Sequence, residues 1–189
     1  MMNSLSLLRG IRFVDSVFPS GGFAYSSGLE AAVQGGAVRN SDDLSRYVED
    51  LLRHGMGRRE AVAVARAWDA QARGSWREAI AADWELDSLK TGRESRLASR
   101  QMGRQVIRVA ADQVKAKPIL SEYRDEVESD RAPGHLAVTF GLTLGVCGWG
   151  PEETAAAFLY QTAVGFVSAA MRLRFGVRLS FEPNGSISA

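Results

Sequence analysis

The segment PEETAAAFLYQTAVGFVSAAMRLR, residues 151–174, decides the fold class because it is apolar on nearly every face of a helix. Pro151 suits the first position of a helix, and Glu152 and Glu153 are favourable beside a helix N-terminus. A helix of this kind is expected in the middle of a bundle. We therefore predict an all-α fold, a single-domain helical bundle, with this segment inside it.

A second apolar segment, residues 136–149, lies just before the first and raises the question of membrane insertion. It is too short to cross a bilayer. Residues 155–171 approach the roughly 20 residues that a span needs, but they include Gln161, Thr162 and Ser168. We therefore expect both segments to be buried core helices, and we expect no membrane-spanning segment.

Helical periodicity dominates the rest of the chain, and strand-like alternation is limited to a weak pattern at residues 175–181. Apolar residues recur every three or four positions after a helix start at Ser41, where Asp42 and Asp43 occupy the first turn. Pro118 sets the latest end of a long helix, because proline disfavours helix in the residue before it. The other expected helices cover residues 58–73, 76–89, 91–114, 135–146 and 151–174.

Length and composition limit the domain organisation and the class of function. The 189 residues suffice for one core, and no repeat or long linker divides them, so residues 1–189 are expected to form one domain. A formal net charge of +1 argues against a nucleic-acid or membrane-surface binder. The single cysteine, Cys147, excludes an internal disulfide, and residues 1–11 lack a signal-peptide pattern. We therefore expect a cytoplasmic protein.

Residues that could carry catalysis are few. The chain has two histidines, His54 and His135, and Cys147, which lie far apart in sequence, and it has no HExxH, CxxC, phosphate-loop or GxSxG motif. His54 is interpreted as a solvated residue at a helix end and Cys147 as an inert buried thiol. His135 stands at a helix start, where a neutral imidazole could bind a metal. We expect no catalytic residue, no metal site and no enzyme activity.

The segment FPSGGFAYSSGLE, residues 18–30, is the first candidate for a binding surface. Pro19 and the glycine pair after it force a tight turn between apolar residues. The side chains crowded beyond this turn form either a lid on the core or a partner-binding surface, and a buried tyrosine can do both by presenting its hydroxyl group. The candidate partner contacts are Phe23, Tyr25, Ser26 and Glu30.

The second candidate is a ridge of five arginines at spacings of three, four, four and four residues, which share one face of the helix expected at residues 91–114. Like charges four residues apart cost about 0.2–0.5 kcal/mol per pair, so the ridge needs compensation. Three explanations stay open: solvent and salt, an internal contact with the acidic run at residues 122–130, or an acidic partner protein. The ridge comprises Arg93, Arg96, Arg100, Arg104 and Arg108, and the first four are candidate partner contacts.

Both segments resemble those of the UreF family of urease accessory proteins. Residues 18–30 resemble the opening signature of that family, and TGRESRLASRQMG, residues 91–103, resembles its mid-chain pattern. GHLAVTFG, residues 134–141, and the helix at residues 157–173 also fit. The matches occur in the right order across about residues 7–173, which makes the resemblance specific.

The resemblance implies an all-α protein that dimerises and acts as a chaperone and scaffold, not as a catalyst. It implies assembly with the accessory protein called UreD or UreH, then with the GTPase UreG, and delivery of nickel to apo-urease by the resulting complex. Nickel and GTP would be handled by the complex, with no cofactor held tightly by this chain alone. The apolar helical surface at residues 134–173 also favours a homodimer.

The last segment of the chain departs from the family pattern. Family members usually continue past the last long helix into a further helix, whereas residues 174–189 have no helical pattern.

Two other functions compete with the scaffold. The first is a helical nucleic-acid-binding regulator that uses the arginine ridge of residues 93–108. The second is a small enzyme or nickel carrier that uses His135 and Cys147.

Overall fold

The computed structural model describes residues 3–15, 18, 20–22, 25–114, 117–173, 180–181 and 187–188, the last two pairs by their backbone. Within these residues, regular structure is helical apart from the two-residue strands β1 (Ser180–Phe181) and β2 (Ile187–Ser188), which pair antiparallel. The all-α prediction is confirmed. The weak strand pattern expected at residues 175–181 is described only where it overlaps β1.

The helices that periodicity predicts are all present, with ends within two residues of those expected. Three short helices, at residues 4–14, 29–34 and 119–128, were not predicted. The π-helix η2 (Leu51–Met56) directly continues α3. The helices are α1 (Ser4–Val14), α2 (Leu29–Gln34), α3 (Ser41–Asp50), α4 (Glu60–Ala72), α5 (Trp76–Leu89), α6 (Arg93–Gln113), α7 (Ile119–Glu128), α8 (Leu136–Val146) and α9 (Pro151–Arg172).

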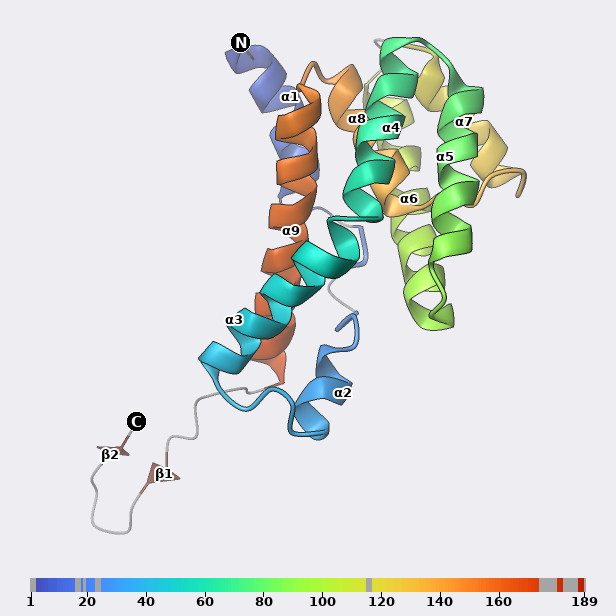
Figure 1. Ribbon diagram of the computed structural model, residues 1–189. Coiled ribbons are helices and arrows are strands. Elements are labelled where there is room, and N and C mark those ends of the chain that lie inside the picture. The colour runs from blue at the N-terminus through green and yellow to red at the C-terminus, as the bar shows by residue number, and fades with distance from the viewer. Residues whose placement is uncertain are drawn as a thin grey trace.

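Helix α8 is the centre of the bundle, with α4 and α6 packed closely against it (Figure 1). Every residue from 137 to 145 is buried. Glycines allow the close approach: a Cβ added at Gly141 would lie 2.3 Å from the carbonyl oxygen of Val64, and one at Gly103 would lie 2.1 Å from that of Gly134. The prediction of a buried core helix at residues 136–149 is therefore confirmed.

The prediction that the last helix lies in the middle of the bundle is wrong. Helix α9 is buried on one side only, and Tyr160, Val167 and Met171 on its other side are 66%, 49% and 67% exposed. The shorter α8 is apolar on all faces and takes the central position, so α9 packs along the outside. Among the described residues, α9 alone has the length and composition of a membrane span. Its inner side nevertheless packs into the core.

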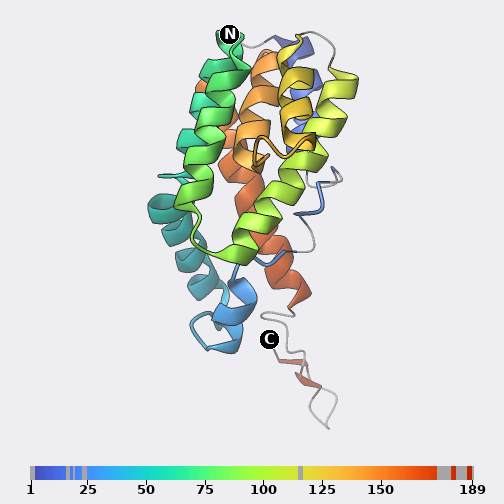
Figure 2. The same cartoon turned by 90° about the vertical axis from the view of Figure 1, so that its right-hand side faces the viewer.

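Helix α9 joins two hydrophobic clusters. Its first half contributes Ala157 and Phe158 to the main core, which α1 and α4–α8 also form. Its second half contributes Phe166 and neighbouring alanines to a smaller cluster with α2, α3 and η2. Figure 1 shows α9 running from the α1 end of the molecule to the α2 end. Figure 2 shows α5 and α6 diverging from the loop that joins them, with α7 and α8, which both helices contact, seen between them.

Candidate partner-binding surface

The loop before α2 contacts α6. The hydroxyl group of Tyr25 donates a hydrogen bond to Oε1 of Gln101 at 2.8 Å. Gly22 also packs against α6, since a Cβ built there would lie 3.3 Å from Sδ of Met102. The two sequence segments proposed to bind partners are therefore joined at Tyr25. Phe23 lies outside the described residues.

Ser26 and Glu30 face a different part of the molecule from Tyr25. Together with Arg172 and Leu173 they line a shallow hollow of about 130 Å³ where α2 meets the end of α9. Glu30 also accepts a hydrogen bond from Gln34 on its own helix, with 3.4 Å between the two atoms. The three candidate contacts of the loop that the structure describes, Tyr25, Ser26 and Glu30, thus do not form a single cluster.

Two arginines of the ridge pair with the acidic run that follows α6. Arg104 donates to Oδ1 of Asp130 at 2.5 Å, and Arg108 lies 3.4 Å from Oε1 of Glu128. The hydrogen bond from Arg104 lowers the pKa of Asp130. The explanation in which the acidic run folds back on the ridge is confirmed for these two residues. Both acidic partners remain accessible, with side chains 79% and 48% exposed.

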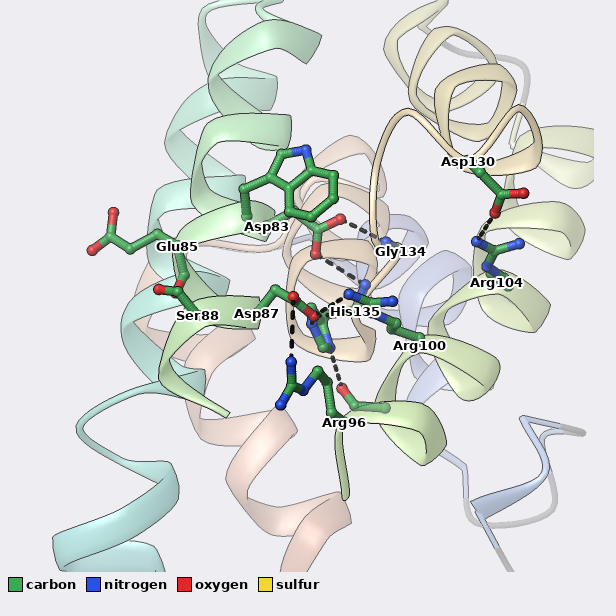
Figure 3. A network of polar contacts seen from close by, with 12 residues as sticks. Asp83, Glu85, Asp87, Ser88, Arg96, Arg100, Arg104, Asp130, Gly134 and His135 are labelled. Atoms are coloured by element: carbon green, nitrogen blue, oxygen red, sulfur yellow. Dashed lines mark hydrogen bonds and ion pairs between the residues drawn. The ribbon is translucent and has the colours of Figure 1, made fainter. Parts of the chain in front are cut away.

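The centre of the ridge pairs with Asp87 of α5, a contact that sequence analysis missed (Figure 3). Arg100 donates from Nε at 2.9 Å and from a terminal nitrogen at 2.5 Å to Oδ1 of Asp87. Arg96 lies 4.0 Å from the other carboxylate oxygen. Asp87 is buried, with 8% of its surface exposed. Burial opposes its ionisation, but the hydrogen bonds from Arg100 and His135 outweigh that effect, so the pKa of Asp87 is lowered.

His135 is fully buried beneath this pair. Its Nε2 lies 2.9 Å from Oδ1 of Asp87, and its Nδ1 lies 3.0 Å from the hydroxyl oxygen of Ser99. Burial lowers the pKa of His135 to about 4, so the ring is neutral at pH 7. An ionised Asp87 can only accept, which assigns the ring proton to Nε2 and makes Nδ1 the acceptor of the Ser99 hydroxyl. Both ring nitrogens are then engaged within the protein.

Asp83 fixes the start of α8 from the neighbouring turn of α5. Its carboxylate accepts hydrogen bonds from the Tyr123 hydroxyl at 2.7 Å and from the backbone N–H groups of Gly134 at 2.6 Å and His135 at 3.0 Å. These contacts satisfy N–H groups at the helix start. Burial raises the pKa of Asp83 to about 6. Asp83 and Asp87 therefore connect α5 to α6, α7 and α8.

The remaining residues considered for chemistry do not form a joint site. His135 precedes α8 and Cys147 follows it, so the length of that helix, about 16 Å, separates them. Cys147 is buried, and burial raises the pKa of its thiol to about 11, which confirms the inert thiol. The side chain of His54 is 65% exposed on η2, as expected for a solvated residue. Within the described residues, no group of three acidic, histidine or cysteine side chains could hold a metal.

An accessible surface remains along α6, which we call the α6 surface. Leu97, Gln101, Arg104 and Arg108 follow one another at spacings of four, three and four residues, so they share one face of the helix. Leu97 is 52% exposed, and Tyr25 lies beside Gln101. This surface combines apolar area, a phenol group and arginines that pair with accessible carboxylates. Such a combination is typical of protein–protein interfaces.

The chain is similar to known proteins of one family. Residues 38–175 match the UreF family. The urease accessory protein UreF of Yersinia enterocolitica is 33% identical over 177 residues, which covers 91% of this chain and 75% of that protein. The UreF of Photorhabdus laumondii is 31% identical over 172 residues, with the same two coverages. The UreF of Actinobacillus pleuropneumoniae is 31% identical over 163 residues, covering 86% of this chain and 71% of that protein. With a helical bundle and matches over most of its length, the chain belongs to the UreF family of urease accessory proteins.

Proposed function

We propose that this chain is a urease maturation scaffold in the cytoplasm. It assembles with a UreD/UreH-type accessory protein and the GTPase UreG, and the complex delivers nickel to apo-urease. The chain acts as a homodimer and is not an enzyme, and nickel and GTP are handled by the complex. Family membership supports the role in urease maturation. The choice of partners rests on the resemblance of the two sequence segments described above.

The observation that carries this proposal is the meeting of the N-terminal loop and the arginine ridge on the α6 surface. The Tyr25–Gln101 hydrogen bond joins two segments that are 76 residues apart in sequence. Exposed ion pairs such as Arg104–Asp130 contribute only about 0–1 kcal/mol to stability. A carboxylate of a partner can therefore replace Asp130 at little cost and gain a better-buried, bidentate contact.

The ion pairs of the arginine ridge argue against the nucleic-acid-binding regulator. Phosphate binding needs uncompensated positive charge, whereas Asp87, Asp130 and Glu128 pair with the ridge. Leu97 and Tyr25 supply apolar area that a protein partner can bury. A protein with an acidic surface is therefore the better fit for α6.

The test is binding of a UreD-type accessory protein to the double variant Arg104→Ala/Arg108→Ala. The matched control is Arg66→Ala/Arg73→Ala, which removes two exposed arginines that pair with Glu85 and Glu78 away from the α6 surface. We expect the α6 variant to bind at least about tenfold more weakly, and high salt to reproduce the defect by screening. Equal affinity of the two double variants would exclude the α6 surface as the binding site.

A further inference from the structure

Helix α1 carries apolar side chains that the fold leaves exposed. Leu8 is 66% exposed, Ile11 47% and Leu7 37%. At about 100° per residue, these three fall within a sector of roughly 100° on one face of the helix. Leu5, at the start of the helix, is 57% exposed and extends the same apolar area. We call these four residues the α1 stripe, and their grouping on one short helix is typical of an interaction surface.

The contacts on the opposite face of α1 hold the stripe outward. Phe13 is 1% exposed in the main core. A Cβ added at Gly10 would collide with the indole ring of Trp149, so this side of the helix is in close contact with its neighbour. The Trp149 indole N–H donates to the carbonyl oxygen of Ser6 at 3.0 Å, and Gln161 donates to that of Phe13 at 3.4 Å. Rotating α1 to hide the stripe would break these contacts and expose Phe13.

One edge of the stripe is basic. Arg9 and Arg12 follow Leu5 and Leu8 around the helix, and α1 contains no acidic residue. Among the described residues, no ion pair involves either arginine. The guanidinium group of Arg12 lies 4.7 Å from the ring centre of Phe13, a contact that leaves its charge without a carboxylate. In this respect α1 differs from α6, where carboxylates pair with the arginine ridge.

The apolar stripe and its basic edge together define the chemistry of an occupant. We propose that the α1 stripe binds an amphipathic helix of a partner protein, whose apolar side chains cover Leu8 and Ile11 and whose carboxylates pair with Arg9 and Arg12. An apolar helix face laid against such a surface is a common mode of peptide recognition. Arginine suits it because its planar fork binds a carboxylate in a bidentate manner. This interface shares no residue with the α6 surface and goes beyond the proposed function.

The charges around α1 favour a protein helix over two other occupants. A second copy of the chain would bring another α1 that carries only positive charge, so neither pair of arginines would gain a carboxylate. An anionic bilayer would meet carboxylates as well as arginines, because Trp149 contacts Ser6 and so brings Glu152 and Glu153, in the first turn of α9, beside the start of α1 (Figure 1). A partner helix can match such a mixed surface residue by residue.

The test uses two labelled, stapled helical peptides that share one leucine stripe and differ in its border, which is glutamate in the first and lysine in the second. Fluorescence anisotropy should show that the full chain binds the glutamate peptide at least about tenfold more tightly than the lysine peptide. In Arg9→Gln/Arg12→Gln that preference should disappear, because the charges that select the acidic border are gone.

Two further variants separate the apolar contact from the fold. Leu8→Gln should weaken binding of the glutamate peptide at least about tenfold, and circular dichroism should show unchanged helical content because Leu8 is 66% exposed. The matched control is Val62→Gln on α4, which removes a side chain that is 48% exposed outside the stripe. Its affinity for the glutamate peptide should equal that of the unsubstituted chain.

Three results would overturn the proposal: no binding of the glutamate peptide by the unsubstituted chain, equal affinity for both peptides, or unchanged affinity in Leu8→Gln. Co-sedimentation with vesicles of phosphatidylcholine and phosphatidylglycerol that is lost in Leu8→Gln would assign the stripe to a membrane instead. Weaker self-association of Leu8→Gln in analytical ultracentrifugation would assign it to a second copy. None of these measurements involves the accessory protein, whose binding is tested with the Arg104/Arg108 variant.

Discussion

Replacing Arg100 by alanine is expected to destabilise the fold, although sequence analysis places Arg100 on a surface ridge. The substitution removes both hydrogen bonds, at 2.9 and 2.5 Å, from Arg100 to the buried carboxylate of Asp87. His135 then remains the nearest donor to Asp87, and Arg96 stays 4.0 Å away. Asp87 has only 8% of its surface exposed, so water can replace little of what is lost.

The size of the effect follows from the burial of the two partners. Hydrogen bonds to charged groups contribute about 1.5–3 kcal/mol when buried. Because the Arg100 side chain is 30% exposed, we expect the lower part of this range, about 2 kcal/mol, for the pair. For a protein of this size, that corresponds to a fall in Tm of about 4–8 °C. The matched variant Arg104→Ala loses a partner that is 79% exposed, so we expect a change of less than about 1 kcal/mol.

Urea and thermal denaturation of the two single variants measure this difference. A double-mutant cycle with Asp87→Asn should give a coupling energy of about 1–3 kcal/mol between residues 87 and 100, because asparagine removes the buried charge that Arg100 neutralises. If Arg100→Ala and Arg104→Ala lower the stability equally, or if the cycle is additive, the Arg100–Asp87 pair does not anchor α6 as we describe.

Three more expectations rest on the contacts of individual side chains. Tyr25→Phe, which removes only the hydroxyl bonded to Gln101, should weaken binding of the accessory protein less than Tyr25→Ala, and both variants should keep their Tm if Tyr25 acts at a partner surface. In Asp83→Asn, the free energy of unfolding should fall by up to about 3 kcal/mol as the pH is lowered from 6.5 to 4. The reason is that His135 is protonated near pH 6.5 in the unfolded chain, whereas its pKa in the folded protein is about 4. In the unsubstituted protein that loss of stability should be offset by Asp83, whose pKa is about 6 in the folded protein against 3.8 in the unfolded chain. As the pH falls, Asp83 is therefore protonated first in the folded state, which stabilises the fold. Urea titrations at several pH values measure this difference between Asp83→Asn and the unsubstituted protein. Cys147 should resist alkylation at pH 8 until the protein unfolds, because burial raises the pKa of its thiol to about 11.

The sequence predicted the long helices because their signals are local. Ser75 caps α5, and Gly150 with Pro151 marks the start of α9. Helix α7 could have been predicted, since Leu120, Tyr123 and Val127 recur at helical spacing in and just before the acidic run, and all three are buried. The exposure of α9 was not predictable from its own composition, because it depends on which of two apolar helices takes the centre of the bundle. The glycines at positions 103 and 141 allow α6 and α4 to approach α8 closely, which suits α8 to the central position.

The candidate site was predictable to a smaller extent. Helical spacing placed the arginines on one face, but it did not reveal which of them pair with buried groups. Asp83 and Asp87 are four residues apart on the face of α5 that also buries Ala79 and Leu86. Paired carboxylates on such a face are a signal that sequence analysis overlooked. Their hydrogen-bond partners come from residues 100–135, and contacts at that separation cannot be predicted from local periodicity.

The most direct test of the account is an ordered binding experiment with purified proteins. The chain is immobilised, a UreD-type accessory protein is added, and the GTPase UreG follows. The account predicts that the accessory protein is retained, that UreG is retained only after it, and that Arg104→Ala/Arg108→Ala reduces both signals while Arg66→Ala/Arg73→Ala reduces neither. Failure of the folded, unsubstituted chain to retain the accessory protein would contradict the proposed scaffold function.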